Sequence, residues 1–279
     1  MLFRSTGLME NINGQYLNLD PSVRAISFNP FSGIKTILEL RDELPYLSSF
    51  IYLLGSSKSI SRAEEDEKLI TNTLQQVIKE QFDLFKNKLE ITNIRDALYK
   101  EYGEEDRRFS DFARQLDIYC QGGIYEEWFS GECEFSMEKD AMAVEFKGVE
   151  NHPELRDPLV MLLLYHIGKV MYSTDTTKPK IQIIFDEAHR FLGKNPRMDD
   201  FIEQAYRRAR KFDGSIILAT QGFSDIYDSE GGLSRAGKTI IDNSAWKFFM
   251  NQQETSTNLL LSSGIFSFDD VDKKIIRKI

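Results

Sequence analysis

The chain has 279 residues, of which 41% are hydrophobic and 28% are charged. These values are ordinary for a globular protein and exclude wholesale disorder and a collagen-like repeat, and two cysteines are too few for a disulfide scaffold. With 35 basic against 44 acidic residues the net charge is −9, so the chain lacks the surplus of cations that nonspecific nucleic-acid binding needs.

The chain begins with a segment that is not helical in pattern. Residues 14–31 alternate polar and apolar positions and contain two prolines, which is typical of short strands and turns. The N-terminus lacks the apolar stretch of a secretory signal, and the most apolar stretch, 159–172, is shorter than the roughly 20 residues that span a bilayer. We therefore predict a cytoplasmic chain without a transmembrane segment, in which Cys120 and Cys133 are reduced thiols.

The pattern becomes helical from about residue 35 to residue 118. The sequence SRAE (61–64) has the spacing of a capping box, and the apolar residues after it recur every three or four positions as far as Phe85. We predict further helices near 91–102 and from Ser110 onwards, separated by a charged, solvated loop.

The last part of the chain alternates strands and helices. The runs IQIIF (181–185) and SIILAT (215–220) are almost continuously apolar, which is typical of strands buried on both faces of a parallel sheet. Pro158 is expected at the first position of an apolar helix. The predicted order is strand 141–149, helix 158–172, strand 181–185, Arg-rich helix 199–212, strand 215–220 and strand 245–251. This order predicts an α/β domain with a parallel sheet flanked by helices.

Two acidic residues, Asp186 and Glu187, follow the strand 181–185. Ligands of open α/β sheets bind at the carboxyl ends of the strands. In nucleotide hydrolases the first acid of such a pair holds Mg²⁺, usually through water, and the second orients and deprotonates the attacking water. The alternative interpretation is that the two acids only cap the helix that follows.

Gln221 follows the next strand and is expected at the same edge of the sheet. An amide there can sense a γ-phosphate or position a water, although a glutamine in a simple turn is the alternative. Between the two strands lie Arg207, Arg208 and Arg210. An arginine of this segment could stabilise transition-state charge on the nucleotide of a neighbouring subunit, or the segment could be a solvated helix face near the negative end of the helix dipole.

The sequence GLSRAGKT (232–239) matches the phosphate-loop pattern G-x-x-x-x-G-K-[ST], with Lys238 in the lysine position. A phosphate loop needs a strand to lead into it and a helix to receive it. The preceding residues are polar and turn-like, and the match comes after the acidic pair instead of before it. We therefore interpret the match as coincidental.

Several strings of the sequence resemble one protein family. GQYLNLDP, FKGVENHPELRDPLVMLLLYHIGKVMY, IIFDEAHRFL and RRARKFDGSIILATQGFSDIY are similar to the C-terminal ATPase domain of TraC-type conjugative ATPases, the assembly motors of type IV secretion systems, which have a TraG-like P-loop domain. The resemblance implies a RecA-like P-loop NTPase sheet with an all-helical insertion. It divides the chain into an N-terminal part of the core (1–34), the insertion (35–135) and the α/β core (136–279).

The resemblance also implies roles for individual residues. Asp186 and Glu187 match the Walker B acids, so Asp186 would hold Mg²⁺ and Glu187 would serve catalysis on ATP. Gln221 matches the glutamine at the end of the following strand, and Arg207, Arg208 and Arg210 lie in the segment of the family's arginine motif. The implied assembly is a cytoplasmic hexamer at the bacterial inner membrane that contacts other secretion subunits and drives pilus assembly and DNA or protein transfer.

The family's Walker A loop precedes the segment GQYLNLDP, so the chain is expected to be a fragment that lacks this loop and hydrolyses ATP poorly on its own. Two other hypotheses remain. In one, the chain is an enzyme that uses GLSRAGKT as its phosphate loop through an unusual strand order. In the other, it is a non-catalytic scaffold or interaction component of the secretion complex.

Overall fold

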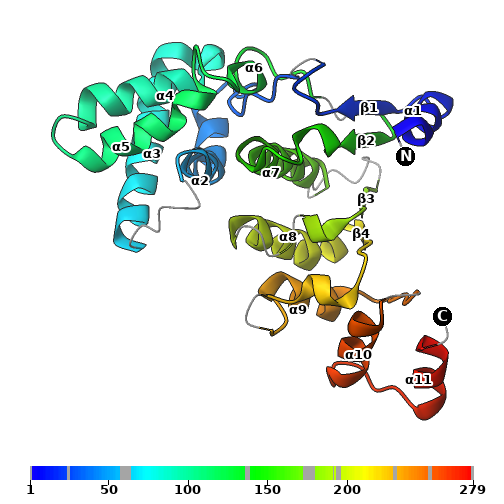
Figure 1. Cartoon of the computed structure of the whole chain (residues 1–279). Coiled ribbons are helices and arrows are strands. Elements are labelled where there is room, and N and C mark those ends of the chain that lie inside the picture. The colour runs from blue at the N-terminus through cyan, green and yellow to red at the C-terminus, as the bar shows by residue number, and fades with distance from the viewer. Residues whose placement is uncertain are drawn as a thin grey trace. The chain divides into compact units, whose positions relative to one another are not determined.

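The computed structural model describes the chain in nine stretches: residues 2–23, 26–56, 64–135, 139–171, 180–190, 192, 196–228, 231–250 and 253–277. The chain divides into two units, residues 1–163 and 164–279. In the described residues each unit contains one parallel pair of short strands, β1 with β2 and β3 with β4 (Figure 1).

Unit 1 is built on the pair β1 (Gln15–Asn18) and β2 (Met142–Glu145). The two strands are parallel neighbours, in a register that sets Gln15 opposite Met142 and Asn18 opposite Glu145. The helix α1 (Leu2–Asn11) precedes β1, and α7 (Pro153–Met171) follows β2 and continues past the boundary between the units.

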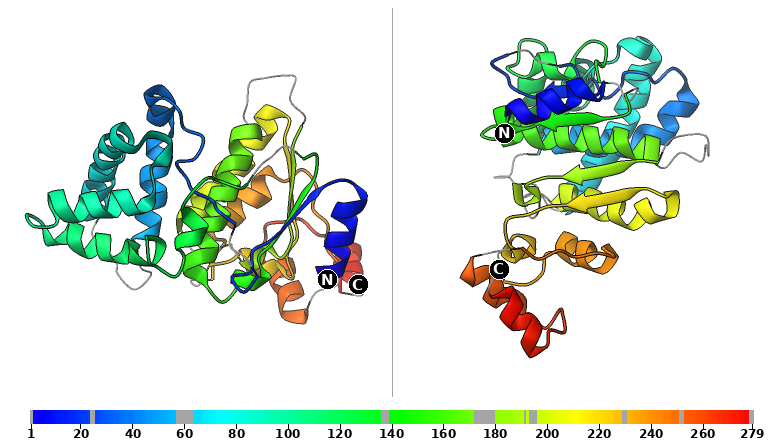
Figure 2. Two further views of the ribbon diagram at one scale, coloured as in Figure 1. Left: turned by 90° about the horizontal axis from the view of Figure 1, so that it is seen from above. Right: turned by 90° about the vertical axis from the view of Figure 1, so that its right-hand side faces the viewer.

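The residues between β1 and β2 fold as helices, which gather to one side of the strand pair (Figure 2). We call residues 35–135 the helical segment. Its α-helices are α2 (Ile37–Leu54), α3 (Glu64–Phe85), α4 (Ile91–Ala97), α5 (Arg107–Leu116) and α6 (Glu126–Phe129). Its fully buried core side chains include Phe50, Ile51, Ile70, Leu74, Phe82, Phe112 and Phe129. This core gives the helical segment a hydrophobic interior of its own.

The two ends of the helical segment are joined by hydrogen bonds. Buried Asn29 donates from Nδ2 to the carbonyl oxygens of Leu89 (3.1 Å) and Gly131 (2.8 Å), and its Oδ1 accepts from the Phe31 N–H (3.0 Å). The Phe28 N–H donates to the Trp128 carbonyl at 2.8 Å. These hydrogen bonds close the base of the helical segment, which is where the chain leaves β1 and where it returns towards β2.

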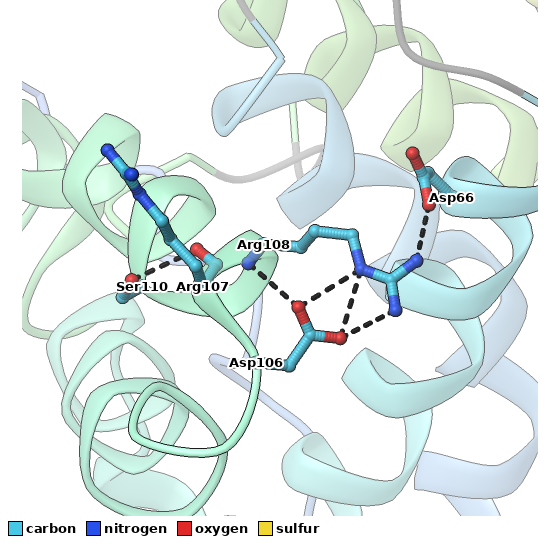
Figure 3. A network of polar contacts seen from close by, with 5 residues as sticks. All are labelled: Asp66, Asp106, Arg107, Arg108 and Ser110. Carbon is cyan, nitrogen blue, oxygen red and sulfur yellow. Dashed lines mark hydrogen bonds and ion pairs between the residues drawn. The ribbon is translucent and has the colours of Figure 1, made fainter.

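Arg108 links two helices of this segment at the protein surface (Figure 3). Its Nη1 lies 2.5 Å from Asp66 in the first turn of α3, and its Nη2 lies 2.6 Å from Asp106. Asp106 caps α5, because its side chain also accepts the Arg108 N–H at 2.9 Å. The cap explains why α5 begins at Arg107, before the predicted start at Ser110.

Other predicted boundaries in unit 1 also differ. Ser61 of the expected capping box lies outside the described residues, and α3 is described from Glu64. The helix predicted over 91–102 ends as α-helix at Ala97 and continues as a π-helix over Leu98–Tyr102. The strand predicted over 141–149 is β2 followed by a short 3₁₀ helix, Lys147–Val149.

The predicted start of the apolar helix at Pro158 is wrong, because α7 starts at Pro153 and contains Pro158. A proline inside a helix has no N–H for the carbonyl four residues earlier, which here belongs to Glu154. The Tyr119 hydroxyl donates to this carbonyl at 2.7 Å. A side chain from a distant helix thus satisfies the group that Pro158 leaves without its usual partner.

Unit 2 contains β3 (Gln182–Phe185), β4 (Ser215–Leu218) and, between them, α8 (Pro196–Ala209). The strands are parallel, and Ile184 pairs with Ile217. After β4 come α9 (Arg235–Asn243), which packs on α8, then α10 (Glu254–Ser262) and α11 (Asp270–Ile276). None of the helices described in either unit is both long and apolar enough to cross a membrane.

Two predictions for unit 2 are wrong. The strands were expected to be buried on both faces, but the paired residues Ile184 and Ile217 are 64% and 47% exposed, so the face of the sheet that carries them is open. The strand predicted over 245–251 is also absent, because residues 245–250 run without a pairing partner among the described residues, and 251 lies outside them. The Arg-rich helix lies at 196–209, followed by a 3₁₀ turn, Arg210–Phe212.

Candidate functional site

Asp186 and Glu187 form a turn directly after β3. The pairing with β4 continues around this turn: the Ala219 N–H donates to the Phe185 carbonyl (2.8 Å), and the Ala188 N–H donates to the Ala219 carbonyl (3.0 Å). These bonds hold Glu187 in the left-handed region with φ of 52°, a conformation that costs a residue with a side chain about 1–3 kcal/mol. Both ends of the turn are therefore tied to Ala219, the residue that follows β4.

The carboxylates of this turn are accessible. Asp186 is exposed and Glu187 is half-buried, and Asp186 Oδ1 accepts the Glu187 N–H at 3.0 Å. No group of three or more His, Cys, Asp and Glu residues in the described part of the chain could hold a metal ion. Mg²⁺ does not need such a cage, because it commonly binds one or two carboxylates, several waters and substrate phosphates. The acidic pair therefore fits a hydrated Mg²⁺.

Gln221 lies in a second turn, two residues after Ala219, which directly follows β4. One oxygen of Asp225, Oδ2, accepts three hydrogen bonds in this turn: from the Thr220 hydroxyl, from the Gln221 N–H (3.1 Å) and from the Gly222 N–H (3.0 Å). The structure therefore sets the exposed Gln221 and the acidic pair at the carboxyl ends of two neighbouring strands.

A residue from α10 supports the same turn. Buried Ser256 accepts the Phe223 N–H at 2.7 Å through its Oγ, and this Oγ also lies against Gly222. Sequence reasoning did not identify Asp225 or Ser256. Asp225 carried a signal, since an aspartate three residues after Gly222 has the spacing to accept the Gly222 N–H, which is one half of a capping box. Ser256 carried none, because its partner is distant in sequence.

The three arginines lie away from this edge. They are at the end of α8 and in the 3₁₀ turn that leads into β4, so they lie near the amino end of β4, whereas Gln221 follows its carboxyl end. Arg208 is placed over the Phe212 ring, 5.9 Å from its centroid, and Arg210 is exposed. Within one chain the structure does not bring Arg207, Arg208 or Arg210 to the acidic pair.

Arg207 has a structural partner that the sequence did not reveal. Glu203, one turn earlier on α8, is only 3% exposed, and Arg207 Nη2 lies 2.5 Å from its Oε1. Arg235 of α9 lies 2.8 Å from Glu203 Oε2, in an ion pair poorly aligned for a hydrogen bond, and 2.8 Å from Asp200. Two arginines therefore compensate one buried carboxylate between α8 and α9.

The residues 232–239 do not form a phosphate loop. Leu233 makes an isolated antiparallel bridge with Tyr227, and Ser234 caps α9 by accepting the Gly237 N–H at 2.9 Å. Gly237 and Lys238 lie in the first turn of α9, where the Lys238 N–H bonds to the Ser234 carbonyl at 2.9 Å. The N–H groups of Ser234, Gly237 and Lys238 therefore already have partners within the protein.

Gly237 is explained by packing. A Cβ at this position would meet the Ile226 carbonyl oxygen more closely than real Cβ atoms do, and that carbonyl is tethered by the Ser234 N–H at 3.0 Å. We expect Gly237→Ala to lower the free energy of unfolding by about 1–3 kcal/mol, although alanine favours helices. Urea unfolding followed by circular dichroism measures this, and a neutral or stabilising effect would contradict the close packing.

The thiols behave as the sequence predicts. Cys120 and Cys133 are both free, and burial raises the pKa of the Cys120 thiol to about 12 and also raises the pKa of Cys133. Neither cysteine is an activated nucleophile.

Comparison with known proteins places the chain in a family. The family model of the TraG P-loop domain matches residues 4–279. The chain belongs to the TraG P-loop domain family. A curated relative, Protein TraC of Escherichia coli (strain K12), is 29% identical over 260 residues, which are 88% of this chain but only 27% of TraC.

Two solved structures share the fold. VirB4 of Thermoanaerobacter pseudethanolicus has a TM-score of 0.70 at 13% identity, over 96% of this chain and 72% of VirB4. The bacterial conjugative coupling protein TrwBdeltaN70 has a TM-score of 0.51 at 13% identity, over 82% of this chain and 56% of TrwB. The α/β P-loop NTPase fold and the resemblance to TraC-type conjugative ATPases of type IV secretion are thus confirmed.

Proposed function

We propose that the chain is part of a TraC-type conjugative ATPase and supplies the hydrolytic edge of its nucleotide site. The observation that carries this proposal is the meeting of Asp186, Glu187 and Gln221 at the carboxyl ends of two hydrogen-bonded parallel strands. Asp186 would hold Mg²⁺ through water, and Glu187 would orient the attacking water and accept its proton. Gln221 would contact the γ-phosphate or that water. Bound Mg²⁺ would neutralise charge on the ATP phosphates.

The arginines would act on a neighbouring subunit, since they lie at the other edge of the sheet in their own chain. Arg208 and Arg210 fit this role better than Arg207, because Arg207 compensates the buried Glu203. An arginine contributed in this way stabilises charge in the transition state of phosphoryl transfer.

The chain by itself would bind and hydrolyse ATP poorly. Its single match to a phosphate-loop pattern, residues 232–239, forms a capped helix start in which the N–H groups of Ser234, Gly237 and Lys238 are already bonded. Without a loop of free N–H groups and a lysine, most contacts to the β- and γ-phosphates are missing. The complete ATPase would supply them from elsewhere.

In the complete assembly the chain would act with other type IV secretion subunits and with other copies of the ATPase, in a hexamer peripheral to the bacterial inner membrane. ATP hydrolysis there would drive pilus assembly and transfer of DNA or protein. The hydrogen bonds between residues 27–31 and 128–131 support the interpretation of residues 35–135 as an insertion into a core formed by residues 1–34 and 136–279.

Titration calorimetry and steady-state turnover with Mg·ATP test these proposals on the purified chain and two variants, Glu187→Gln and Lys238→Ala. We expect weak binding, with turnover equally low in all three proteins. If turnover falls about 10²–10⁴-fold in Glu187→Gln but not in Lys238→Ala, the result would support the proposed role of Glu187 in hydrolysis. The same result would contradict the expectation that the chain alone is poorly active. Loss of nucleotide affinity in Lys238→Ala would instead favour the GLSRAGKT hypothesis.

A non-catalytic scaffold is the second candidate, favoured by the bonded N–H groups of Ser234, Gly237 and Lys238 and by the separate core of the helical segment. Co-purification with a full-length TraC-type ATPase separates the two. If the Glu187→Gln chain binds the ATPase and leaves its turnover at the level seen with the unmodified chain, the scaffold function holds.

A further inference from the structure

Three consecutive backbone N–H groups in the turn after β4 are bound by side-chain oxygens. Asp225 Oδ2 accepts those of Gln221 (3.1 Å) and Gly222 (3.0 Å), and Ser256 Oγ accepts that of Phe223 (2.7 Å). In some loops successive N–H groups bind an anion such as a phosphate. Here the protein's own oxygens occupy all three groups, so they set the position of the backbone and leave none of these donors to a nucleotide.

The side chain of Gln221 is in the opposite situation. It is exposed, and its amide group makes no hydrogen bond to any residue that the structure describes. A fixed backbone with an unbonded side chain suits a group that faces a ligand, because only the side-chain torsions remain to be ordered when the ligand binds. The turn therefore offers the nucleotide site the side-chain amide of Gln221 and not its backbone N–H.

Asp225 is held in place by the buried residues around it. It lies in a short 3₁₀ helix whose first and last residues, Phe223 and Ile226, are each 6% exposed. The Phe223 ring packs against Phe266, with the ring centroids 6.0 Å apart, and the Ile226 carbonyl accepts the Ser234 N–H at 3.0 Å. The carboxylate therefore bonds to the turn from a fixed position.

The end of the same strand fixes the acidic pair. Both ends of the turn that contains Glu187 bond to Ala219, and Gln221 follows Ala219 by two residues. The residue between them, Thr220, donates its hydroxyl to Asp225 as well. The position of Gln221 relative to Glu187 is therefore set at two places: at Ala219, and at the contacts of Asp225 with residues 220–222.

We propose that Asp225 is a positioning residue for nucleotide hydrolysis, which fixes the turn so that the Gln221 amide reaches the γ-phosphate or the attacking water beside Glu187. This inference rests on the proposed function of the edge and adds a residue that contacts neither nucleotide nor metal. A reacting group that is misplaced by about 1 Å can cost about 10²-fold in rate. Asp225 therefore affects hydrolysis through Gln221, whereas a residue that only stabilised the fold would affect it whatever side chain stands at position 221.

A double-mutant cycle on the complete ATPase that contains this sequence tests the proposal. Gln221→Ala should lower kcat by about 10²–10³-fold, as the loss of one transition-state contact does, and Asp225→Ala should lower it by up to about 10²-fold. The KM for ATP should stay unchanged in both, because neither change removes ground-state binding. In the Gln221→Ala protein, Asp225→Ala should have no further effect. An equal fall in both backgrounds, or no fall when Gln221 is present, would overturn the proposal.

Further variants separate positioning from folding. Asp225→Asn keeps an oxygen that can accept the two N–H groups, so kcat should return to within about tenfold of the unmodified protein. Asp228→Ala is the matched control, because exposed Asp228 likewise accepts a backbone N–H, from Gly232 at 3.1 Å, but in a turn without Gln221. It should leave kcat unchanged, and a fall as large as that of Asp225→Ala would contradict the proposal. If Asp225→Ala does not fold, Thr220→Val replaces it in the cycle and should show a smaller fall with the same dependence on Gln221.

Amide hydrogen exchange in the purified chain gives a readout that needs no turnover. Asp225→Ala should speed exchange at Gln221 and Gly222 by about tenfold, because each amide loses a hydrogen bond to a charged group. Exchange at Phe223 should not change, because its N–H is bonded to Ser256. Unchanged exchange at Gln221 and Gly222, or equal acceleration at all three amides, would overturn the proposal.

Glu187→Gln separates a failure of this inference from a failure of the proposed function. If turnover of the complete ATPase is lost in Glu187→Gln but is unaffected by Asp225→Ala, the hydrolytic edge stands and the positioning role alone is overturned. If turnover is retained in Glu187→Gln, both are overturned, and the hydrogen bonds of Asp225 then only stabilise the turn.

Discussion

Replacing Arg207 and Arg235 together by alanine is expected to lower the free energy of unfolding by about 3 kcal/mol. The double variant removes both cations from Glu203, which is 3% exposed, and leaves a buried carboxylate without compensation. The value lies at the lower end of the range for broken buried pairs, because both arginines are largely exposed and water can replace them in part. Chemical denaturation followed by circular dichroism measures the change.

The matched rescue is Glu203→Met in the same double variant. A methionine removes the buried charge at similar length, so stability should return to within about 1 kcal/mol of the unmodified chain. If the double variant is as stable as the unmodified chain, the two arginines are solvated surface residues and Arg207 again becomes a candidate for action on a neighbouring nucleotide.

The second large effect is expected at Asn29. Asn29→Ala removes a hydrogen bond to the buried Leu89 carbonyl, one to the partly buried Gly131 carbonyl and one from the buried Phe31 N–H, at about 1 kcal/mol each. We expect a loss of about 3 kcal/mol in the stability of unit 1. Hydrogen exchange should show the loss first at the base of the helical segment, among the amides of residues 28–31 and 128–131.

Asn87→Ala is the control for this prediction. Asn87 is exposed and lies in the turn between α3 and α4, so its replacement should change stability by no more than about 0.5 kcal/mol. A loss at Asn29 no greater than at Asn87 would show that the base of the helical segment does not depend on these bonds.

The sequence predicted the parts of the candidate site that depend on local pattern. Two apolar runs located β3 and β4, and the polar residues that follow them, Asp186, Glu187 and Gln221, lie at one edge because parallel neighbours end on the same side. The failure of GLSRAGKT as a phosphate loop was also predictable, since no strand leads into it and Ser234 is a good helix cap.

Other features could not be predicted because their cause lies far away in the sequence. In α7 the hydroxyl of Tyr119 bonds to the Glu154 carbonyl that Pro158 leaves without its usual partner, and Ser256 accepts the Phe223 N–H beside the turn at Gln221. The pattern of 245–251 is that of a strand, but a strand also needs a neighbour, and the described residues provide none. The pattern of one segment therefore predicts its tendency to form a strand, but not whether a second strand pairs with it.

The closed base of the helical segment has a consequence for the order of folding. Pairing β1 with β2 directly would require closing a loop from residue 15 to residue 142, a slow step with a large entropic cost. Once the helical segment has folded and residues 27–31 lie against 128–131, only two short stretches remain to be closed. This shortens the loop by a little over two doublings of length and lowers the closure cost by roughly 1.4 kcal/mol. We therefore expect the helices to act as the folding nucleus of unit 1, with the parallel strands pairing after them.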